Sequence, residues 1–253
     1  MEIVAAAYFA YLAGMAIARR KLRPAVLALA TLVCVLFVGM QYILPLVYLL
    51  VGYWLPALLV RTPNRRFERR LLDVDHTLFG IDGLATFEQR APRLLVEYLE
   101  LSYLLCYAVV PAGYAVLVAS GHEGYALDRF WSCVLLASFI CYGLLPWLPT
   151  RAPRAVEATR GTARSSIRQV NLAVLNRASV QWNTFPSGHT AASLATALAV
   201  GAYMPAAGIV LGVVAFSIAA GSVVGRYHYA ADALAGAVAA VLAFVMVTGA
   251  RAL

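Results

Sequence analysis

Long apolar blocks separated by short polar segments dominate the chain. The blocks run for 16 to 22 residues with almost no charge inside them, about the length that crosses a roughly 30 Å hydrocarbon core as a helix. Eight such spans are predicted, at residues 3–18, 24–40, 42–60, 98–118, 129–148, 188–204, 206–224 and 229–250. The pattern predicts an all-α fold, a polytopic integral membrane helical bundle with about eight transmembrane helices.

The division of residues 24–60 needs a second argument, because 37 apolar residues are too many for one crossing and tight for two. The basic residues favour two crossings. With eight spans, 18 of the 20 Lys and Arg lie on one side of the membrane, in the segments 19–23, 61–97, 149–187 and 225–228. The positive-inside rule then makes this side cytoplasmic in a multi-pass protein, which we expect in a cell inner membrane.

Composition agrees with a membrane protein. The chain is 62% hydrophobic and 13% charged, whereas soluble domains are roughly half apolar and a quarter charged. Topology and anionic headgroups account for the net charge of +8, and no soluble basic domain with aromatic platforms suggests nucleic-acid binding. Block 3–18 lacks a basic leading region, so we interpret it as a span rather than a cleavable signal.

The cysteines predict neither disulfides nor a zinc site. All lie inside apolar blocks without a CxxC pair, so we expect buried free thiols at Cys34, Cys106, Cys133 and Cys141. No cofactor and no metal is predicted from the sequence.

Two polar segments exceed a simple turn, and both are predicted to lie at the membrane interface. Residues 61–97 contain Asp73, Asp75 and His76, which could suggest a metal site but are more typical of a solvated interfacial helix. Residues 155–183 carry apolar positions at helical spacing among arginines. That pattern favours a helix on the membrane surface, and a lid over a site is the alternative.

Three polar clusters fall at the ends of spans on the same face, at residues 149–154, 186–189 and 225–236. The 39 residues from His189 to His228 fit one helix out and one helix back, each about 25–28 Å long at 1.5 Å per residue. His228 and Asp232 are four residues apart and therefore lie on one helix face. The clusters are expected to converge.

The residue types in these clusters suit phosphoryl transfer. Asp232 would fix the tautomer of His228 and leave its other ring nitrogen free to attack, while His189 would protonate a leaving oxygen. Arg154 can bind phosphate oxygens through its planar fork. The turn at Ser187 offers backbone N–H groups at a helix N-terminus, which is a natural anion site. Charge neutralisation by arginine instead of metal is predicted.

The strings "PSGHT" and, after a helical hairpin, "HYAAD…G" resemble the type 2 phosphatidic acid phosphatase superfamily. These membrane enzymes have a six-helix core and act without metal through a phosphohistidine. The resemblance covers residues 42–250 and leaves residues 1–41 as two additional N-terminal transmembrane helices. It implies that His228 is the nucleophile, Asp232 its orienting carboxylate and His189 the general acid. Ser187 and Gly188 resemble the phosphate-cradling turn.

Two positions depart from the motifs of that superfamily. Arg154 resembles the arginine of the first motif, but the usual upstream lysine is missing and Arg151 is the candidate substitute. The third motif usually has an arginine six residues before the histidine, where this chain has Ser222, and the nearby arginine is Arg226. The form "RYHYAAD" looks more like the inositol-phosphorylceramide synthase branch, whose members pass a phospho-headgroup to an alcohol.

The resemblance therefore implies an enzyme that cleaves a lipid-linked phosphate and passes the phospho group to an alcohol acceptor. A lipid-phosphate phosphatase, which releases phosphate to water, uses the same residues and is the main alternative. A transporter is the alternative of another class, and Glu100 near the start of a span favours it. A catalytically inactive scaffold is a further one. The expected partners are the bilayer, a lipid-phosphate substrate and an alcohol acceptor.

Overall fold

A computed structural model describes residues 1–40, 43–157, 165–180, 182–183 and 185–249. In this part of the chain the regular structure is helical, apart from one isolated bridge between Thr150 and Asn183. The helices are α1 (Glu2–Ala18), α2 (Leu22–Phe37), α3 (Leu44–Trp54), η1 (Leu55–Leu59), α4 (Arg65–Phe79), α5 (Gly83–Arg90), α6 (Arg93–Leu104), η2 (Leu105–Tyr107), α7 (Val109–Ala119), α8 (Tyr125–Leu144), α9 (Pro153–Val156), α10 (Ser166–Ala178), α11 (Gly188–Gly201), α12 (Pro205–Val224) and α13 (Ala230–Gly249). The all-α prediction is confirmed.

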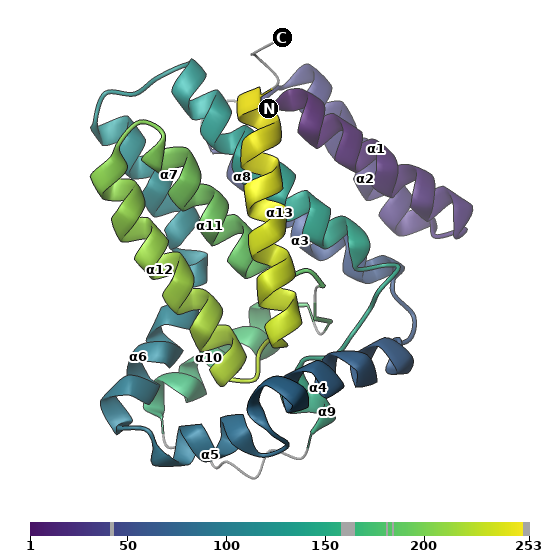
Figure 1. Cartoon of the computed structure of the whole chain (residues 1–253). Coiled ribbons are helices and arrows are strands. Elements are labelled where there is room, and N and C mark those ends of the chain that lie inside the picture. Colours follow the sequence, from purple (N-terminus) through teal and green to yellow (C-terminus); the bar gives the residue numbers. More distant parts are fainter. Residues whose placement is uncertain (41–42, 158–164, 181, 184, 250–253) are drawn as a thin grey trace.

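Helix α11 lies at the centre of the bundle and packs against α7, α8, α12 and α13 (Figure 1). Its buried positions are almost all Ala, Ser, Thr or Gly, and such small residues let helix backbones approach closely. Gly236 on α13 is one such position, because a Cβ there would collide with the backbone carbonyl of Ser187. This close packing brings the first turns of α11 and α13 together.

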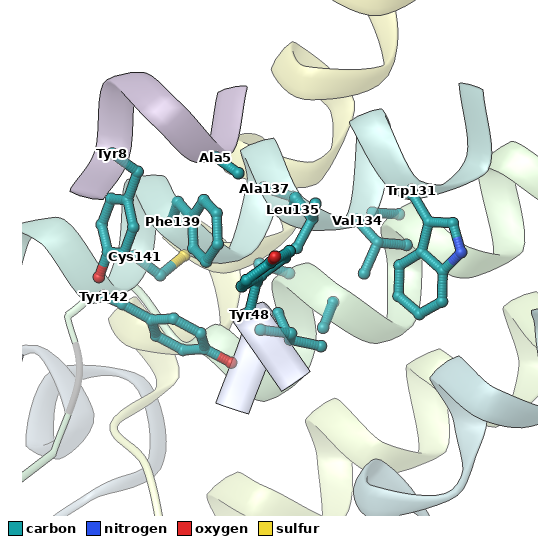
Figure 2. Packing of buried hydrophobic residues seen from close by; sticks show 14 of the residues in the cluster. Ala5, Tyr8, Tyr48, Trp131, Val134, Leu135, Ala137, Phe139, Cys141 and Tyr142 are labelled. Carbon is teal, nitrogen blue, oxygen red and sulfur yellow. The ribbon is translucent and has the colours of Figure 1, made fainter. Parts of the chain in front are cut away.

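The N-terminal hairpin of α1 and α2 lies against one side of the bundle, beside α3 and α8 (Figure 1). Tyr8 on α1 stacks on Phe139 of α8 with ring centroids 4.0 Å apart, and both rings lie in the packed cluster shown in Figure 2. The Tyr8 hydroxyl also donates to the carbonyl of Gly52 on α3 at 2.8 Å. Aromatic pairs of this kind contribute about 0.5–1.5 kcal/mol beyond burial, so this contact fastens the hairpin to the bundle.

The helix lengths support a polytopic membrane protein but differ from the predicted spans. In the described ranges, α8, α12 and α13 are long and apolar enough to cross a membrane, and α6–η2 with α7 forms a fourth candidate that is bent by 65°. Pro111 lies in the first turn of α7, where its ring excludes continuation of the preceding helix. Helices α1, α2 and α3–η1 are apolar but shorter. The count of eight crossings stays a prediction.

The apolar stretch 24–60 contains two helices, as the charge argument required. Helix α2 ends at Phe37 and α3 begins at Leu44. The segment between them includes Gly39, whose backbone has a positive φ of 78°, and residues 41–42 lie outside the described residues.

Helices α4, α5, α9 and α10 gather at one end of the bundle (Figure 1). Helix α4 is amphipathic, but the expectation that its acidic residues are solvated is wrong for Asp75, which is 2% exposed and faces the start of α13. Helix α10 was also expected to bury its apolar face, and it does not do so. It buries Arg168, Asn171 and Leu175 while Val170 is half-exposed, because α6 offers polar partners such as Glu100.

Candidate active site

Backbone contacts bring the three polar clusters of the sequence together at the end of the bundle where α11 and α13 begin. The joining hydrogen bonds run from Asn183 N to Thr150 O (2.7 Å), from Arg154 N to Arg226 O (3.2 Å) and from Ser187 N to Asp232 O (2.9 Å). Each bond links a different pair of clusters or their immediate neighbours. These backbone hydrogen bonds hold the three clusters in fixed relative positions.

The side chains of His228 and Asp232 form a buried pair. His228 Nδ1 lies 3.3 Å from Asp232 Oδ2. The expectation that both residues lie on one helix is wrong, because α13 begins at Ala230 and His228 lies in the turn before it. The same oxygen accepts a hydrogen bond from Asn183 Nδ2 at 2.6 Å and from the backbone N–H of Tyr229 at 3.1 Å. Since Asp232 is held from two other directions, it fixes the imidazole of His228 through one ring nitrogen and leaves the other free.

His189 faces His228 across a cavity of about 490 Å³, which both residues line. The two imidazole centroids are 5.7 Å apart with their planes at 79°. The rings of Tyr53, Tyr103 and Tyr107 surround His189 at centroid distances of 6.4, 5.6 and 5.8 Å. A group the size of a phosphate placed in the cavity would meet both histidines.

Arg154 also lines the cavity, and its guanidinium lies over the ring of Tyr227 at 5.1 Å. Tyr227 in turn stacks on Tyr103 with centroids 4.0 Å apart. Within the described ranges Arg154 has no carboxylate partner. The aromatic support leaves its N–H groups available to an anion in the cavity.

Arg151 and Arg226 lie elsewhere. Arg151 makes a two-pronged ion pair with buried Glu68, with N–O distances of 3.1 and 2.9 Å. Arg226 pairs with Asp75 at 2.7 Å and with Glu157. Neither arginine is among the residues that line the cavity. In this arrangement both fasten loops of the site to α4 and to the segment after α9.

Ser187 and Gly188 form the turn that begins α11 and do not line the cavity themselves. The buried hydroxyl of Ser187 accepts the backbone N–H of Thr190 at 3.3 Å, which is the usual N-cap contact. A Cβ at Gly188 would collide with the ring of Tyr142, so glycine allows the turn to pack closely on α8. The turn positions His189 one residue later.

A comparison with protein families assigns the chain to a superfamily. Residues 69–246 match the PAP2 superfamily. This chain belongs to the PAP2 superfamily. Comparisons with curated proteins and with solved structures find no match. PAP2 enzymes are generally phosphatases with a histidine nucleophile, so membership indicates a phosphatase or phosphotransferase that acts on phosphate esters. The superfamily predicted from the motifs is confirmed, whereas the comparison gives no evidence for the inositol-phosphorylceramide synthase branch.

Asn183 is a site residue of this PAP2 protein that the sequence did not reveal. Its amide donates to Asp232, 49 residues away, and also lies 3.3 Å from the hydroxyl of Thr150. The surrounding residues "QWNTF" form no motif or spacing that would identify Asn183 as a hydrogen-bond partner of Asp232.

Arg168 is a second such residue, because it brings another guanidinium to the cavity wall from α10. It donates to Glu88 at 2.7 Å and to Glu100 at 3.4 Å. Glu100, the residue that favoured transport, also accepts Asn171 at 2.7 Å and the hydroxyl of Tyr227 at 2.6 Å. Burial, followed by the nearby Glu100 carboxylate, raises the pKa of Tyr227 well above its usual range, so this hydroxyl stays a donor.

Position 222, where the PAP2 motif usually has an arginine, has a different task. The carbonyl of Ser222 accepts the backbone N–H groups of Tyr227 and His228 at 2.9 and 3.0 Å. Its hydroxyl bonds the carbonyl of Ala219 within α12. Ser222 is fully buried and does not line the cavity, so the second cavity arginine comes from α10 instead.

Among the residues that the structure describes, no group of three or more His, Cys, Asp or Glu is placed to hold a metal ion. The four cysteines are free, but Cys34 is exposed on α2 and not buried as expected.

Proposed function

We propose that this PAP2 protein cleaves a lipid-linked phosphate through a phosphohistidine on His228 and passes the phospho group to an alcohol. One observation carries the proposal. His228 is held by Asp232 on one side, and on the other it faces a cavity that also contains His189 and Arg154. Nucleophile, acid and anion-binding cation therefore surround one space large enough for a phosphorylated headgroup.

The first half-reaction follows from these positions. With the Nδ1 proton of His228 donated to Asp232, the lone pair on Nε2 attacks phosphorus and a P–N bond forms. The P–O bond to the leaving group breaks, and His189 gives a proton to the departing oxygen. Arg154 neutralises the non-bridging oxygens, in the role that electrostatic stabilisation has in phosphoryl transfer.

The second half-reaction reverses these roles. His189 takes the proton from the incoming hydroxyl, whose oxygen attacks phosphorus as the P–N bond breaks and His228 is regenerated. We favour an alcohol over water because "RYHYAAD" resembles the transferase branch and because α10 covers one side of the cavity with Leu172 and Leu175. Hydrolysis by water, giving a lipid-phosphate phosphatase, is the second candidate and uses the same residues.

A lipid substrate is supported by the lining of the cavity. Apolar side chains of Leu172, Leu175, Val180 and Trp182 stand beside the arginines. In a lipid phosphate, the phosphate group would contact the arginines and the acyl chain would contact the apolar side chains.

The decisive experiment supplies purified protein with a phospholipid labelled in its phosphate, together with glycerol, inositol or a long-chain alcohol. Wild type should form an acid-labile, alkali-stable phosphoprotein, and His228→Ala should form none. His122→Ala, the same change in a distant loop, is the matched control and should label normally. Equal labelling of His228→Ala would contradict the assignment of the nucleophile. Label recovered only as free phosphate, whatever acceptor is present, would establish the phosphatase instead.

Two further properties belong to the proposal. If arginine, and not a metal ion, neutralises the charge of the phosphate, turnover should persist in excess EDTA. A loss of turnover that added magnesium restores would contradict this. The cytoplasmic placement of the active face predicts that a cysteine at exposed Arg177 is labelled in intact cells only by a membrane-permeant reagent. Labelling by an impermeant reagent would place the active face outside.

A further inference from the structure

A second cavity, of about 450 Å³, lies where the turn after α1 meets the segment after η1 and the end of α8. Three arginines line it, namely Arg19, Arg20 and Arg61, and its lining contains no acidic residue. The active-site cavity shares no lining residue with it. The three arginines precede residues 69–246, which match the PAP2 superfamily, while Pro146 and Pro149 from the matched region complete the lining.

Arg19 is fixed in place without losing its charge. Its guanidinium donates to the backbone carbonyls of Leu59 at 3.0 Å and Pro146 at 3.1 Å. It also lies over the ring of Trp147 at 5.2 Å. The carbonyls are neutral, and two of five guanidinium N–H groups are used. The remaining donors form a preorganised cation at the cavity wall.

Arg20 adopts a backbone conformation that side chains rarely tolerate. Its φ is 54°, and Arg226 beside the catalytic histidine, with φ of 57°, is the other positive-φ residue besides glycine in the described ranges. The conformation belongs to the turn that ends α1, in which the backbone N–H of Lys21 donates to the carbonyl of Ala16 at 2.8 Å. This turn brings Arg20 to the same cavity as Arg61.

The charge balance here is unlike that of three other arginines near the active site. Arg151, Arg168 and Arg226 each have a carboxylate oxygen within 2.9 Å. In the part of the chain that the structure describes, Arg19, Arg20 and Arg61 have no ion pair. Three like charges around one hollow repel one another unless an anion occupies it.

We propose that this cavity binds the phosphate group of an anionic phospholipid. The apolar sequence neighbours of the lining residues favour a lipid over a soluble anion, because Ile17, Leu22 and Leu58 are exposed by 60%, 78% and 50%. Acyl chains would cover these side chains while the headgroup phosphate meets the guanidinium forks. The inference does not rest on the reaction proposed for His228. It assigns a lipid site to the junction of the N-terminal hairpin with the bundle.

The test measures lipid retained by the full chain in detergent, using native mass spectrometry with phosphatidylglycerol, phosphatidylcholine or inorganic phosphate. The informative variant is Arg20→Gln with Arg61→Gln, which leaves the carbonyl contacts of Arg19 intact. Its matched control is Arg66→Gln with Arg70→Gln, two exposed arginines of α4 outside the cavity. Both variants lose the same charge, so general attraction to anionic lipid falls equally in the two. Unchanged helical melting curves would verify folding.

Wild type should retain phosphatidylglycerol in preference to phosphatidylcholine. The cavity variant should bind phosphatidylglycerol on the order of thirtyfold more weakly than the control variant, because it alone loses two direct charge-assisted contacts to the phosphate. Displacement of the lipid by inorganic phosphate at equal concentration would show a phosphate site whose source is soluble, which overturns the lipid assignment. Equal weakening in both variants, or none in the cavity variant, would overturn the site itself.

Discussion

Two carboxylates hold the turn that carries His228, the proposed nucleophile, and they come from two different helices, α13 and α4. Asp232 lies in the first turn of α13 and contacts the imidazole of His228, which lies four residues earlier in the turn before that helix. Asp75 comes from α4, 155 residues before Ala230, whose backbone N–H it accepts at 2.9 Å, and it also pairs with Arg226 at 2.7 Å. Asp232 thus orients the reacting ring, whereas Asp75 orients the backbone that presents it.

Their partners differ in kind as well as in position. Asp232 accepts from an amide, a backbone N–H and an imidazole, so its charge is shared with the group that becomes positive during the reaction. Asp75 meets a permanent cation. Burial raises the pKa of Asp75, while the N–H of Ala230 and the guanidinium of Arg226 counter part of that rise. In the proposed mechanism the first carboxylate takes part in the chemistry, whereas the second anchors α4 to the site.

The largest effect is expected from Asp232→Asn. An amide in this place can no longer act as the anionic acceptor that holds Nδ1–H and stabilises imidazolium, so turnover should fall on the order of 10³-fold or more. The rate of donor-lipid consumption by purified protein measures this. Asp73→Asn, on the exposed face of α4, is the control and should be neutral. A loss below about tenfold for Asp232→Asn would remove this residue from the mechanism.

Asp75→Asn should have a smaller effect of another kind. The amide oxygen can still accept the N–H of Ala230, but the ion pair with Arg226 is lost and Arg226 retains Glu157. We expect kcat to fall about tenfold while KM changes little, because Arg154 and His189 are untouched. Asp73→Asn again serves as the control, two residues away on the same helix.

The effect of Asp75→Asn on kcat, compared with its effect on KM, distinguishes a positioning role of Asp75 from other roles. A loss as large as that of Asp232→Asn would mean that Asp75 contacts the reacting groups. Unchanged kcat would mean that α4 does not position the turn.

The same comparison explains what the sequence revealed about the site. The contact between His228 and Asp232 was predicted from their spacing of four residues on one helix. The contact is present, but His228 lies in the turn before α13, so the single helix that the prediction assumed is wrong. The role of Asp75 could not be predicted, since an acidic residue on a polar amphipathic helix has the same pattern whether it faces water or a partner 155 residues away. Arginines share this ambiguity. Nothing in the string "PTRAPR" separates Arg154, which lines the cavity, from Arg151, which pairs with Glu68.

The fold divides in the same way. Apolar blocks predicted the helices of the bundle, because burial in lipid demands long uncharged segments. The 65° bend between α6–η2 and α7, and the short length of α11 at 14 residues, depend on packing between helices and were not predicted. The wall that α10 forms depends on hydrogen bonds from Arg168 and Asn171 to Glu100 and on the packing of Leu175 with Tyr227, and both partners lie far away in the sequence.

The smallest predicted effect concerns Glu68, a second buried carboxylate of α4, whose pKa shift has the opposite sign to that of Asp75. Burial alone would raise the pKa of Glu68, but the hydrogen bonds and charge of Arg151 outweigh it and hold this pKa below its ordinary value of 4.5. A carboxylate with a lowered folded-state pKa stabilises the fold above the unfolded value, and this contribution is lost as pH falls through the folded value. Wild type should therefore melt at a higher temperature than Glu68→Gln at pH 7, and the difference should shrink as pH falls below 4.5.

Melting curves from pH 7 to pH 3 measure this difference, with Glu123→Gln, a change in an exposed loop, as the control. A difference that stays constant over this range would mean that Glu68 acts through its shape and not its charge, and the ion pair with Arg151 would then not fasten α4 to the site.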